Sequence, residues 1–299
     1  MTVLNKFRGA LLGLACGDAV GTSVEFRKRG TFSPIKDMHG GGPFNLPKGY
    51  WTDDTSMALC LATSLIECRG FDAKDQMQRY LRWRDTGYLS STGRCFDVGN
   101  ATSLALSDFK QTGNPFSENP DPKKAGNGCL MRLAPVPLFF YPNRELTIEM
   151  SGESSRTTHA ALECIEASQL FGAMLFMALD GANKEQILQN HGLDNVSSEK
   201  LQLVADGAYF NKVEDQIKGS GYVVESLEAA LWCFQQTDTF EAAILKATNL
   251  GDDADTTAAI CGQVAGAYYG ESAISQHWLN QLHMKNKIGE LAEKLCNAK

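Results

Sequence analysis

The sequence predicts an all-α protein, and three observations support this prediction. Almost no stretch alternates apolar and polar residues over five or more positions, as a half-buried strand would. Apolar residues instead recur at helical spacing along most of the 299 residues. Glycines recur every fourth residue near both ends of the chain, which places them on one face of a helix. We therefore expect a compact, single-domain helical fold over residues 1–299.

Helical periodicity and capping residues define the expected elements. The segment 54–68 begins at Asp54-Thr55-Ser56, which are favoured at helix N-caps, and ends at Arg69-Gly70, where glycine favours a stop. The segment 254–269 begins after Asp252-Asp253 and ends before a glycine in the same way. In chain order, the expected helices are 3–20, 54–68, 73–84, 98–109, 127–140, 159–180, 183–190, 223–236, 239–248, 254–269 and 286–297.

Two irregular stretches separate these helices. Residues 28–51 and 111–128 are rich in glycine and proline, which favour turns over helix. Loops this long inside a compact domain are usually functional. We therefore expect these two segments to be functional loops.

Regularly spaced glycines predict an unusually close contact between two helices. A glycine inside a helix costs about 1 kcal/mol relative to alanine, so rows of glycine need a compensating contact. The rows are Gly9, Gly13 and Gly17 near the N-terminus and Gly262, Gly266 and Gly270 near the C-terminus. We expect two central helices, one from each end of the chain, to pack backbone to backbone, which favours one domain over two.

Composition excludes several classes of protein. The 28 basic and 35 acidic residues give a net charge of −7, which argues against nucleic acid as a main partner. No window approaches 18–20 uninterrupted apolar residues, so we expect no transmembrane segment. Glycines and Asp18 interrupt the apolar N-terminus, so we do not interpret it as a cleaved signal peptide. The nine cysteines are odd in number and form no C-x-x-C pair, which is typical of a reducing compartment. We expect a cytoplasmic protein.

Two acidic clusters at helix starts are the strongest chemical signal. They are Trp51-Thr52-Asp53-Asp54-Thr55 and Gly251-Asp252-Asp253-Ala254-Asp255-Thr256-Thr257. Either cluster alone could be a helix cap. Together they contain more carboxylates than caps need, and packed like charges repel unless a cation lies between them. Carboxylate and hydroxyl oxygens suit Mg²⁺, Mn²⁺ or Ca²⁺, so a site with two metal ions about 3.5–4 Å apart explains both clusters better.

A third acidic residue follows the first helix. Glu25 stands between Val24 and Phe26, and a carboxyl group in such surroundings can have a raised pKa or orient a water molecule. It could equally be a surface residue. Its functional assignment depends on the two acidic clusters lying nearby.

Five motifs follow one another along the chain. They are GDAVGTSVEF (17–26), WTDDTSMAL (51–59), GNGCLMRLAPV (126–136), TTHAALECIEA (157–167) and NLGDDADTTAAICGQVAGAYYG (249–270). Together they resemble the ADP-ribosylglycohydrolase family, in the family's order and from residue 7 to about 270. The stretch GRCFDVGNATSLAL (93–106), followed by TGNP (112–115), is most similar to the branch that contains the dinitrogenase reductase-activating glycohydrolase.

The resemblance implies an all-α orthogonal helix bundle with a dinuclear Mg²⁺ or Mn²⁺ site at helix N-termini. It implies hydrolysis of the bond between ADP-ribose and an acceptor, which in this branch is the guanidinium of an arginine side chain. Asp252 stands where some relatives have glycine, so we expect it to lie outside the metal ligands. The metal ligands implied are Thr52, Asp53, Asp54, Asp253, Asp255 and Thr256.

The resemblance also implies a catalytic residue and five substrate-binding residues. Glu25 matches the catalytic glutamate. The substrate-binding positions are Asp97, Asn127, Gly128, His159 and Tyr222. Each of these has a structural alternative: Asp97 and His159 could cap helices, Asn127-Gly128 could form a tight turn, and Tyr222 could belong to the core. The loop lysines Lys123 and Lys124 would suit a diphosphate or be solvated.

We hypothesise that Glu25 is a general base or proton shuttle and that Asp97 stabilises the departing guanidinium, since cleavage at the anomeric carbon builds positive charge on the ribose. The implied partners are an ADP-ribosylated protein substrate and the ADP-ribose product, and we expect a monomer. Three alternatives stay open. They are cleavage of another ADP-ribose linkage (to serine or a free metabolite), a metal-dependent phosphoesterase, and a non-catalytic ADP-ribose-binding module.

Overall fold

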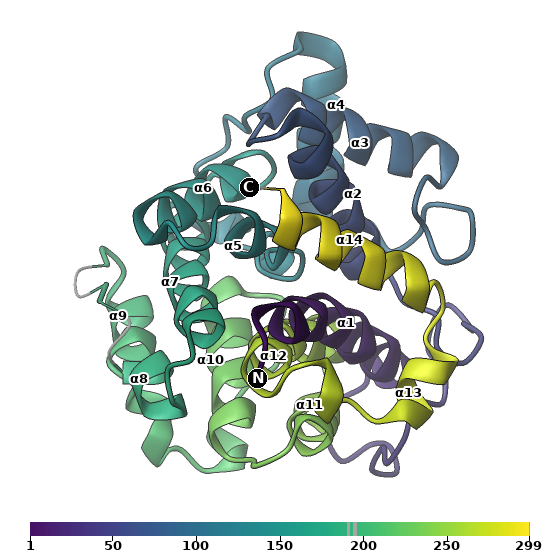
Figure 1. Cartoon of the computed structure of the whole chain (residues 1–299), viewed down its shortest axis with the longest axis vertical. Coiled ribbons are helices and arrows are strands. Elements are labelled where there is room, and N and C mark those ends of the chain that lie inside the picture. Colours follow the sequence, from purple (N-terminus) through teal and green to yellow (C-terminus); the bar gives the residue numbers. More distant parts are fainter. Residues whose placement is uncertain (190–191, 194–195, 299) are drawn as a thin grey trace.

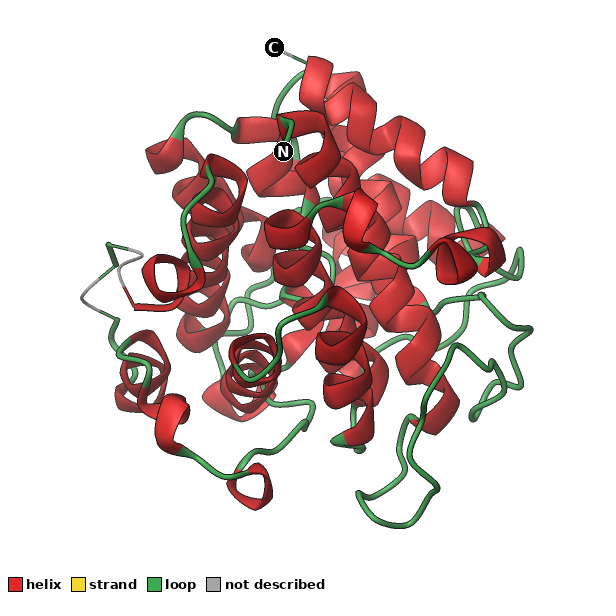
Figure 2. Cartoon of the chain, turned by 60° about the horizontal axis from the view of Figure 1, so that its bottom comes forward, coloured by secondary structure: helices red, strands yellow, loops and turns green. Residues whose placement is uncertain are grey.

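The computed structural model describes residues 1–189, 192–193 and 196–298, and over these residues the protein is all-α (Figures 1 and 2). The only strand-like pairings in this part are three isolated bridges. The helices are α1 (Val3–Gly21), α2 (Asp53–Cys68), α3 (Ala73–Thr86), α4 (Asn100–Thr112), α5 (Pro135–Phe140), α6 (Arg144–Arg156), α7 (Leu162–Asp180), α8 (Lys184–Gln189), α9 (Glu199–Ala205), α10 (Val223–Gln235), α11 (Phe240–Asn249), α12 (Ala254–Tyr269), α13 (Gln276–Gln281) and α14 (Lys285–Asn297). The all-α prediction is confirmed.

Helices α1 and α12 pack against each other in the middle of the molecule (Figure 1). A Cβ atom at Gly13 would lie 2.3 Å from the carbonyl oxygen of Gly262, and one at Gly262 would lie 2.1 Å from that of Gly13. Gly9 and Gly17 face α12 with the same closeness. The predicted backbone-to-backbone contact between the two ends of the chain is therefore confirmed.

One member of the predicted glycine rows has a different role. Gly270 caps α12 with a φ of +77°, so it ends the helix, although it still lies against α1, where a Cβ atom at Gly9 would lie 2.7 Å from its carbonyl carbon. The row on α1 continues instead at Gly21, where a Cβ atom would lie 2.4 Å from the Cα of Asp255. The end of α1 is thereby held directly against the start of α12.

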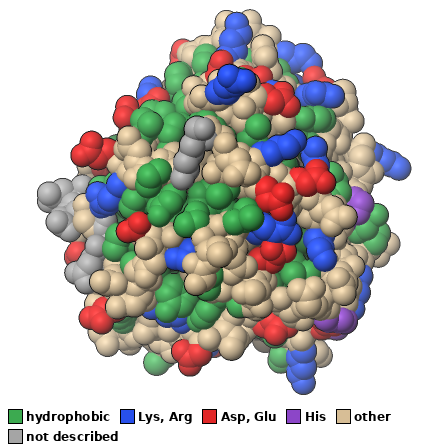
Figure 3. Space-filling model, in the orientation of Figure 1, with side chains coloured by type: hydrophobic (Ala, Val, Ile, Leu, Met, Phe, Trp, Pro, Cys, Tyr) green, Lys and Arg blue, Asp and Glu red, His purple; other side chains and the backbone are tan. Residues whose placement is uncertain are grey.

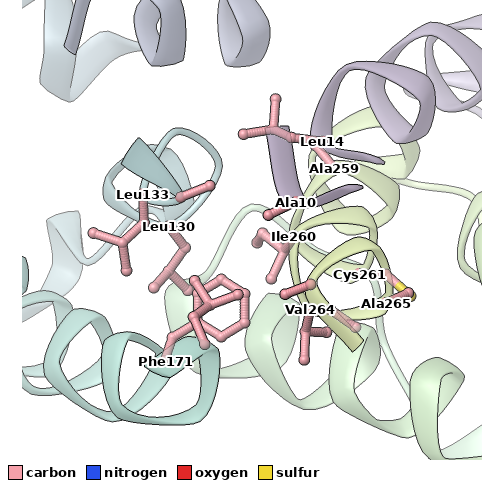
Figure 4. Close-up of a cluster of buried hydrophobic side chains, with 14 of the residues drawn as sticks. Ala10, Leu14, Leu130, Leu133, Phe171, Ala259, Ile260, Cys261, Val264 and Ala265 are labelled. Carbon is pink, nitrogen blue, oxygen red and sulfur yellow. The ribbon is translucent and has the colours of Figure 1, made fainter. Parts of the chain in front are cut away.

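The other helices surround this central pair. Helices α10 and α11 pack on α12, and α14 packs on α1 and α2. Apolar side chains from α1, α7, α12 and the segment 130–133 meet in the core, as Figure 4 shows. The residues labelled there include Leu14, Leu133, Phe171 and Val264. On the face drawn in Figure 3, acidic and basic side chains are interspersed.

Helix α7 is long and apolar enough to cross a membrane by length and composition alone. Its sequence does not contain an uninterrupted apolar run, but its average apolar character passes that test. In this fold 67% of its most apolar 18-residue window is buried inside the protein. We therefore assign α7 as a core helix.

Several predicted boundaries are wrong. The helix expected at 127–140 divides into a 3₁₀ turn at Asn127–Cys129 and α5, which Pro135 begins because proline is suited to the first position of a helix. The helix expected at 159–180 begins only at Leu162, and that expected at 98–109 begins at Asn100. Residue 190, at the end of the expected helix 183–190, lies outside the described residues.

Three helices, α6, α9 and α13, were not predicted. For α6 a local signal exists, since the Asn143 side chain caps it by accepting a hydrogen bond from the backbone N–H of Leu146 at 3.0 Å. The loop at 28–51 is non-helical as predicted. The loop at 111–128 is mostly irregular, with a short 3₁₀ turn at Pro122–Lys124 and the first part of another at Asn127.

We predict that Gly13→Ala lowers the free energy of unfolding by about 3 kcal/mol, because the new methyl group would overlap the α12 backbone. Urea unfolding followed by circular dichroism measures this change. Gly70→Ala is the matched control, since no heavy atom lies within 4 Å of a Cβ there. A loss of less than 1 kcal/mol for Gly13→Ala would contradict the close contact.

Candidate functional site

The buried carboxylate of Asp18 connects α1 to the start of α2. Its Oδ1 accepts hydrogen bonds from the backbone N–H of Thr52 at 2.8 Å and from its hydroxyl at 3.0 Å. Its Oδ2 accepts from the backbone N–H of Thr55 at 3.0 Å and from its hydroxyl at 2.6 Å. An aspartate from one helix thus satisfies the free N–H groups at the N-terminus of another. Asp18 lies within the motif GDAVGTSVEF (17–26), but the sequence did not predict a role for it.

The two predicted acidic clusters meet at this point. The Thr52 hydroxyl lies 3.3 Å from Oδ2 of Asp255, and the Thr256 hydroxyl donates to Oδ1 of Asp54 at 3.3 Å. These contacts join the first residues of α2 to the first turn of α12. Of the six predicted metal ligands, Asp253 is partly buried and the following are buried: Thr52, Asp53, Asp54, Asp255 and Thr256.

The carboxylates of these clusters are not used as helix caps. Neither Thr52, the N-cap of α2, nor Asp253, the N-cap of α12, makes a side-chain capping hydrogen bond. Oδ2 of Asp54 and Oδ1 of Asp255 are buried without any hydrogen-bond partner. Buried polar atoms are almost always satisfied, so these two oxygens indicate a missing ligand. The capping alternative therefore does not explain the clusters.

The carboxylates form two groups that could each hold a cation. One oxygen from each of Asp18, Asp54 and Asp255 lies within 4.8 Å of the other two, and so does one from each of Glu25, Asp97 and Asp255. Both groups contain Asp255. Anionic oxygens at this spacing are suited to a hard divalent cation. The residues therefore fit a metal centre, with Asp255 between its two halves.

Burial makes this cluster electrostatically unfavourable as a set of free anions. Desolvation, reinforced by Asp97 and other carboxylates, raises the pKa of Glu25 to about 9. Desolvation likewise raises the pKa of Asp97 to about 7 and that of Asp18 to about 6, although hydrogen bonds to Thr55 and Thr52 act in the opposite direction for Asp18. The pKa values of Asp54 and Asp255 are raised further by the same causes. A nearby cation would favour the charged forms.

A cleft of about 750 Å³ opens beside the carboxylates. Its lining includes the carboxylates of Glu25, Asp53, Asp97, Asp253 and Asp255, and also Asn127, Gly128, His159 and Tyr222. Lys123 and Lys124 also line it. A volume of this size suits a small organic ligand. All the predicted substrate-binding residues therefore lie on one cleft with the carboxylates.

Asn127 and Gly128 form a turn that is hydrogen-bonded to Asp253, the residue before α12, and to α10. The Asn127 side-chain amide donates to Oδ2 of Asp253 at 2.8 Å and to the Ser226 hydroxyl at 3.2 Å. Its backbone N–H donates to the carbonyl of Gly221 at 3.1 Å. A Cβ atom at Gly128 would lie 2.8 Å from Cε1 of His159, so only glycine fits there without displacing that ring.

His159 and Tyr222 also line the cleft. His159 is buried, its Nδ1 lies 2.8 Å from the Thr158 hydroxyl, and burial together with Arg132 lowers its pKa to about 3. It is therefore neutral near pH 7. Tyr222 is the N-cap of α10, is half-buried, and donates its hydroxyl to Glu163 at 2.6 Å, so it is not a core residue.

Asp97 adopts a left-handed backbone conformation with a φ of +57°, which only some non-glycine residues tolerate. The N-cap of α4 is Gly99, so Asp97 does not cap that helix. Asp252 is exposed and belongs to neither group of carboxylates that could hold a cation. Its backbone instead exchanges hydrogen bonds with the segment after Glu25: Phe26 N–H donates to its carbonyl at 2.7 Å, and its own N–H donates to Arg27 at 2.8 Å.

The profile of the ADP-ribosylglycohydrolase family matches residues 1–299. The chain belongs to this family. The family resemblance that the sequence motifs indicated is therefore confirmed.

Two named family members match nearly the whole chain, and both are named as enzymes that remove ADP-ribose. The chain is 43% identical to the ADP-ribosylarginine hydrolase Tri1 of Serratia proteamaculans, over 98% of this chain and 79% of that protein. It is 32% identical to the ADP-ribosyl-[dinitrogen reductase] glycohydrolase of Rhodospirillum rubrum, over 95% and 92%. The chain is thus more similar in sequence to this Tri1 than to the dinitrogen reductase glycohydrolase, which represents the branch that the motifs suggested. A solved ADP-ribosylglycohydrolase-related protein complex superposes with a TM-score of 0.88 at 43% identity, covering 99% of this chain and 98% of that one.

We predict that saturating Mg²⁺ or Mn²⁺ raises the melting temperature of the EDTA-treated protein by about 5 °C or more, by mass action on the folded state. Asp54→Asn should abolish most of this rise while leaving the metal-free protein at least as stable, because it removes a buried, unpartnered charge. Asp238→Asn, at an exposed position, is the control. Scanning calorimetry with and without metal measures both effects, and an undiminished rise in Asp54→Asn would contradict the site.

We predict that the metal-free protein becomes less stable as the pH rises from about 6 to 9. The folded pKa values of Glu25 and Asp97, about 9 and about 7, exceed those of unfolded carboxyl groups near 4. The folded state therefore binds more protons in this interval, and stability present at low pH is lost as the pH rises through the folded pKa values. Thermal unfolding in EDTA at each pH measures the slope. A melting temperature that rises with pH would be the opposite result.

Proposed function

We propose that this protein is a metal-dependent hydrolase that releases ADP-ribose from modified arginine side chains of proteins and so reverses mono-ADP-ribosylation. The observation that carries the proposal is the cleft in which Glu25 and Asp97 lie next to Asp255, whose Oδ1 is buried without a hydrogen-bond partner, as is Oδ2 of Asp54. Membership of the ADP-ribosylglycohydrolase family supports the hydrolysis. The names of the two relatives at 43–44% identity, both ADP-ribosylarginine hydrolases, support arginine as the acceptor.

The cleft offers separate surfaces to the parts of ADP-ribose. We propose that the Asn127–Gly128 turn meets the diphosphate and its adjoining ribose, with Lys123 and Lys124 supplying positive charge. Tyr222 presents an aromatic ring in the cleft, and neutral His159 contributes a wall. We propose that the anomeric carbon lies next to Glu25 and Asp97.

Thr52, Asp53, Asp54, Asp253, Asp255 and Thr256 are the residues that we propose to hold the metal ions. We propose two ions, Mg²⁺ or Mn²⁺, because the carboxylates form two groups that share Asp255. When bound, such ions would supply positive charge that orients ribose hydroxyls and polarises water. Asp18 lies in one of these groups, but its four hydrogen bonds to Thr52 and Thr55 indicate a structural role in positioning α2.

The chemistry of the bond needs a group that moves a proton beside a developing positive charge on the ribose. Glu25 is 3% exposed, its Oε2 lies 3.5 Å from the Thr22 hydroxyl, and burial raises its pKa, so it can hold or take up a proton near neutral pH. We propose that it is the general base or proton shuttle. Asp97, whose carboxylate lies in the same cluster as those of Glu25 and Asp255, would stabilise the cationic guanidinium as it leaves.

We further propose that residues 1–299 form one domain, because α1 and α14, from opposite ends of the chain, both belong to the central packing. We also propose a cytoplasmic monomer. The nine cysteines, all within the described residues, are free, which suits a reducing compartment.

The test of the function is release of ADP-ribose from an arginine-ADP-ribosylated protein, with Mg²⁺ or Mn²⁺ and again with EDTA, with products identified by mass. A serine-linked substrate is assayed in parallel. Metal-dependent release of intact ADP-ribose from arginine is the expected result. Release only from serine would overturn the acceptor assignment, release of AMP would indicate a phosphoesterase, and binding without release would indicate a binding module.

We predict that Glu25→Gln lowers kcat in this assay by about 100-fold or more, because the amide cannot exchange a proton at neutral pH. The metal-dependent rise in melting temperature should persist in this variant, which separates loss of chemistry from loss of the metal centre. Glu225→Gln, on the partly buried first turn of α10, is a control for the substitution itself. Wild-type turnover in Glu25→Gln would remove this residue from the mechanism.

A further inference from the structure

Phe26 is an exposed aromatic residue in the lining of the cleft. Its side chain is 66% exposed, although a phenyl ring is normally buried. It follows Glu25 directly in sequence and lines the same cleft as Glu25, Asp97 and Asp255. No role was assigned to it above.

The backbone of Phe26 is also in a costly conformation. Its φ of +62° lies in the left-handed region, which disfavours bulky side chains by about 1–2 kcal/mol. Of the seven described non-glycine residues with positive φ, two line the cleft, Phe26 and Asp97, and a third, Asp252, is hydrogen-bonded to Phe26. Strained residues persist only where the surrounding structure holds them, and they are concentrated at functional sites.

The backbone of Phe26 is held by the loop Gly251-Asp252, which precedes Asp253. Its N–H donates to the carbonyl of Asp252 at 2.7 Å, and the N–H of Asp252 donates to Arg27 at 2.8 Å. An isolated bridge between Lys28 and Gly251 continues this pairing. The backbone of Phe26 is therefore held next to Asp253, the residue that follows Asp252.

We propose that the Phe26 ring binds the guanidinium group of the modified arginine, with its face against the planar cation. This inference rests on the proposed function and adds a specificity-determining residue on the acceptor side. A guanidinium group presents N–H donors along its edge and a weakly hydrated face, so it suits a carboxylate on one side and an aromatic ring on another. Asp97 and Phe26 both line the cleft and supply these two surfaces.

The position of Phe26 next to Glu25 in the chain argues for the acceptor as the group that contacts its ring. Tyr222 is a second aromatic residue in the lining of the cleft, and it donates its hydroxyl to Glu163. Phe26 adjoins the residue proposed to move the proton, so whatever contacts its ring lies near the bond that breaks. A neutral acceptor such as serine would gain little from the π face, so the ring favours a cationic leaving group.

The test compares Phe26→Leu, Phe26→Gly and Phe26→Tyr in the arginine assay on the full-length, metal-loaded protein. Leucine keeps apolar bulk without a π face, glycine removes the ring and relieves the left-handed strain, and tyrosine keeps the ring. Phe116→Leu is the matched control, because Phe116 also lies under a guanidinium, that of Arg156 at 4.7 Å, and does not line the cleft.

We expect KM for the ADP-ribosylarginine substrate to rise about two- to fivefold in Phe26→Leu and Phe26→Gly, the scale of a partly exposed cation–π contact. Phe26→Tyr should leave KM near the wild-type value, because it keeps the aromatic ring. The dissociation constant of ADP-ribose, which lacks the guanidinium, should rise less than KM, and a merely structural role would raise both together.

Three results would overturn the inference, and they are distinguishable. Unchanged KM in Phe26→Leu and Phe26→Gly, with an active wild-type enzyme, would contradict the role of Phe26 alone. Absence of ADP-ribose release from arginine by the wild-type protein would contradict the proposed function and, with it, the guanidinium as the ligand of this ring. An equal rise of KM and of the ADP-ribose dissociation constant would show that the effect of the ring is not specific to the guanidinium.

Discussion

The backbone contact between α1 and α12 is the constraint on which the rest of the structure depends. Gly13 and Gly262 lie so close that neither position has room for a methyl group, and Gly21 continues the contact to the Cα of Asp255. The end of one helix and the start of the other are thereby fixed together. Asp18, on the last turns of α1, then fixes the start of α2 at the same point.

This arrangement concentrates negative charge where the protein can least solvate it. The carboxyl groups of Asp54 and Asp255 are buried, and each has an oxygen without a hydrogen-bond partner. Folding brings these groups together at a cost, since burial and mutual repulsion raise their pKa values. A bound cation would offset that cost, which is why we propose the metal site at this point of the fold.

Much of this could be predicted from the sequence, because the informative residues are local signals. The glycine rows predict the central helix pair, and the two acidic clusters predict where its chemistry lies. The exceptions are long-range effects. Asp18 forms its four hydrogen bonds only when α1 and α2 meet, so its spacing along the chain carries no signal. Phe26 reads as an ordinary apolar residue until the structure shows its exposure and its positive φ.

The central claim is that metal ions lie between the starts of α2 and α12. The most direct measurement is anomalous X-ray diffraction from crystals grown with Mn²⁺. The account predicts two anomalous peaks within coordination distance of Asp255, one also near Asp54 and the other near the cleft-facing carboxylates, as expected for oxygen ligands. No peak at Asp255 at saturating Mn²⁺, or a peak only at surface carboxylates, would contradict it.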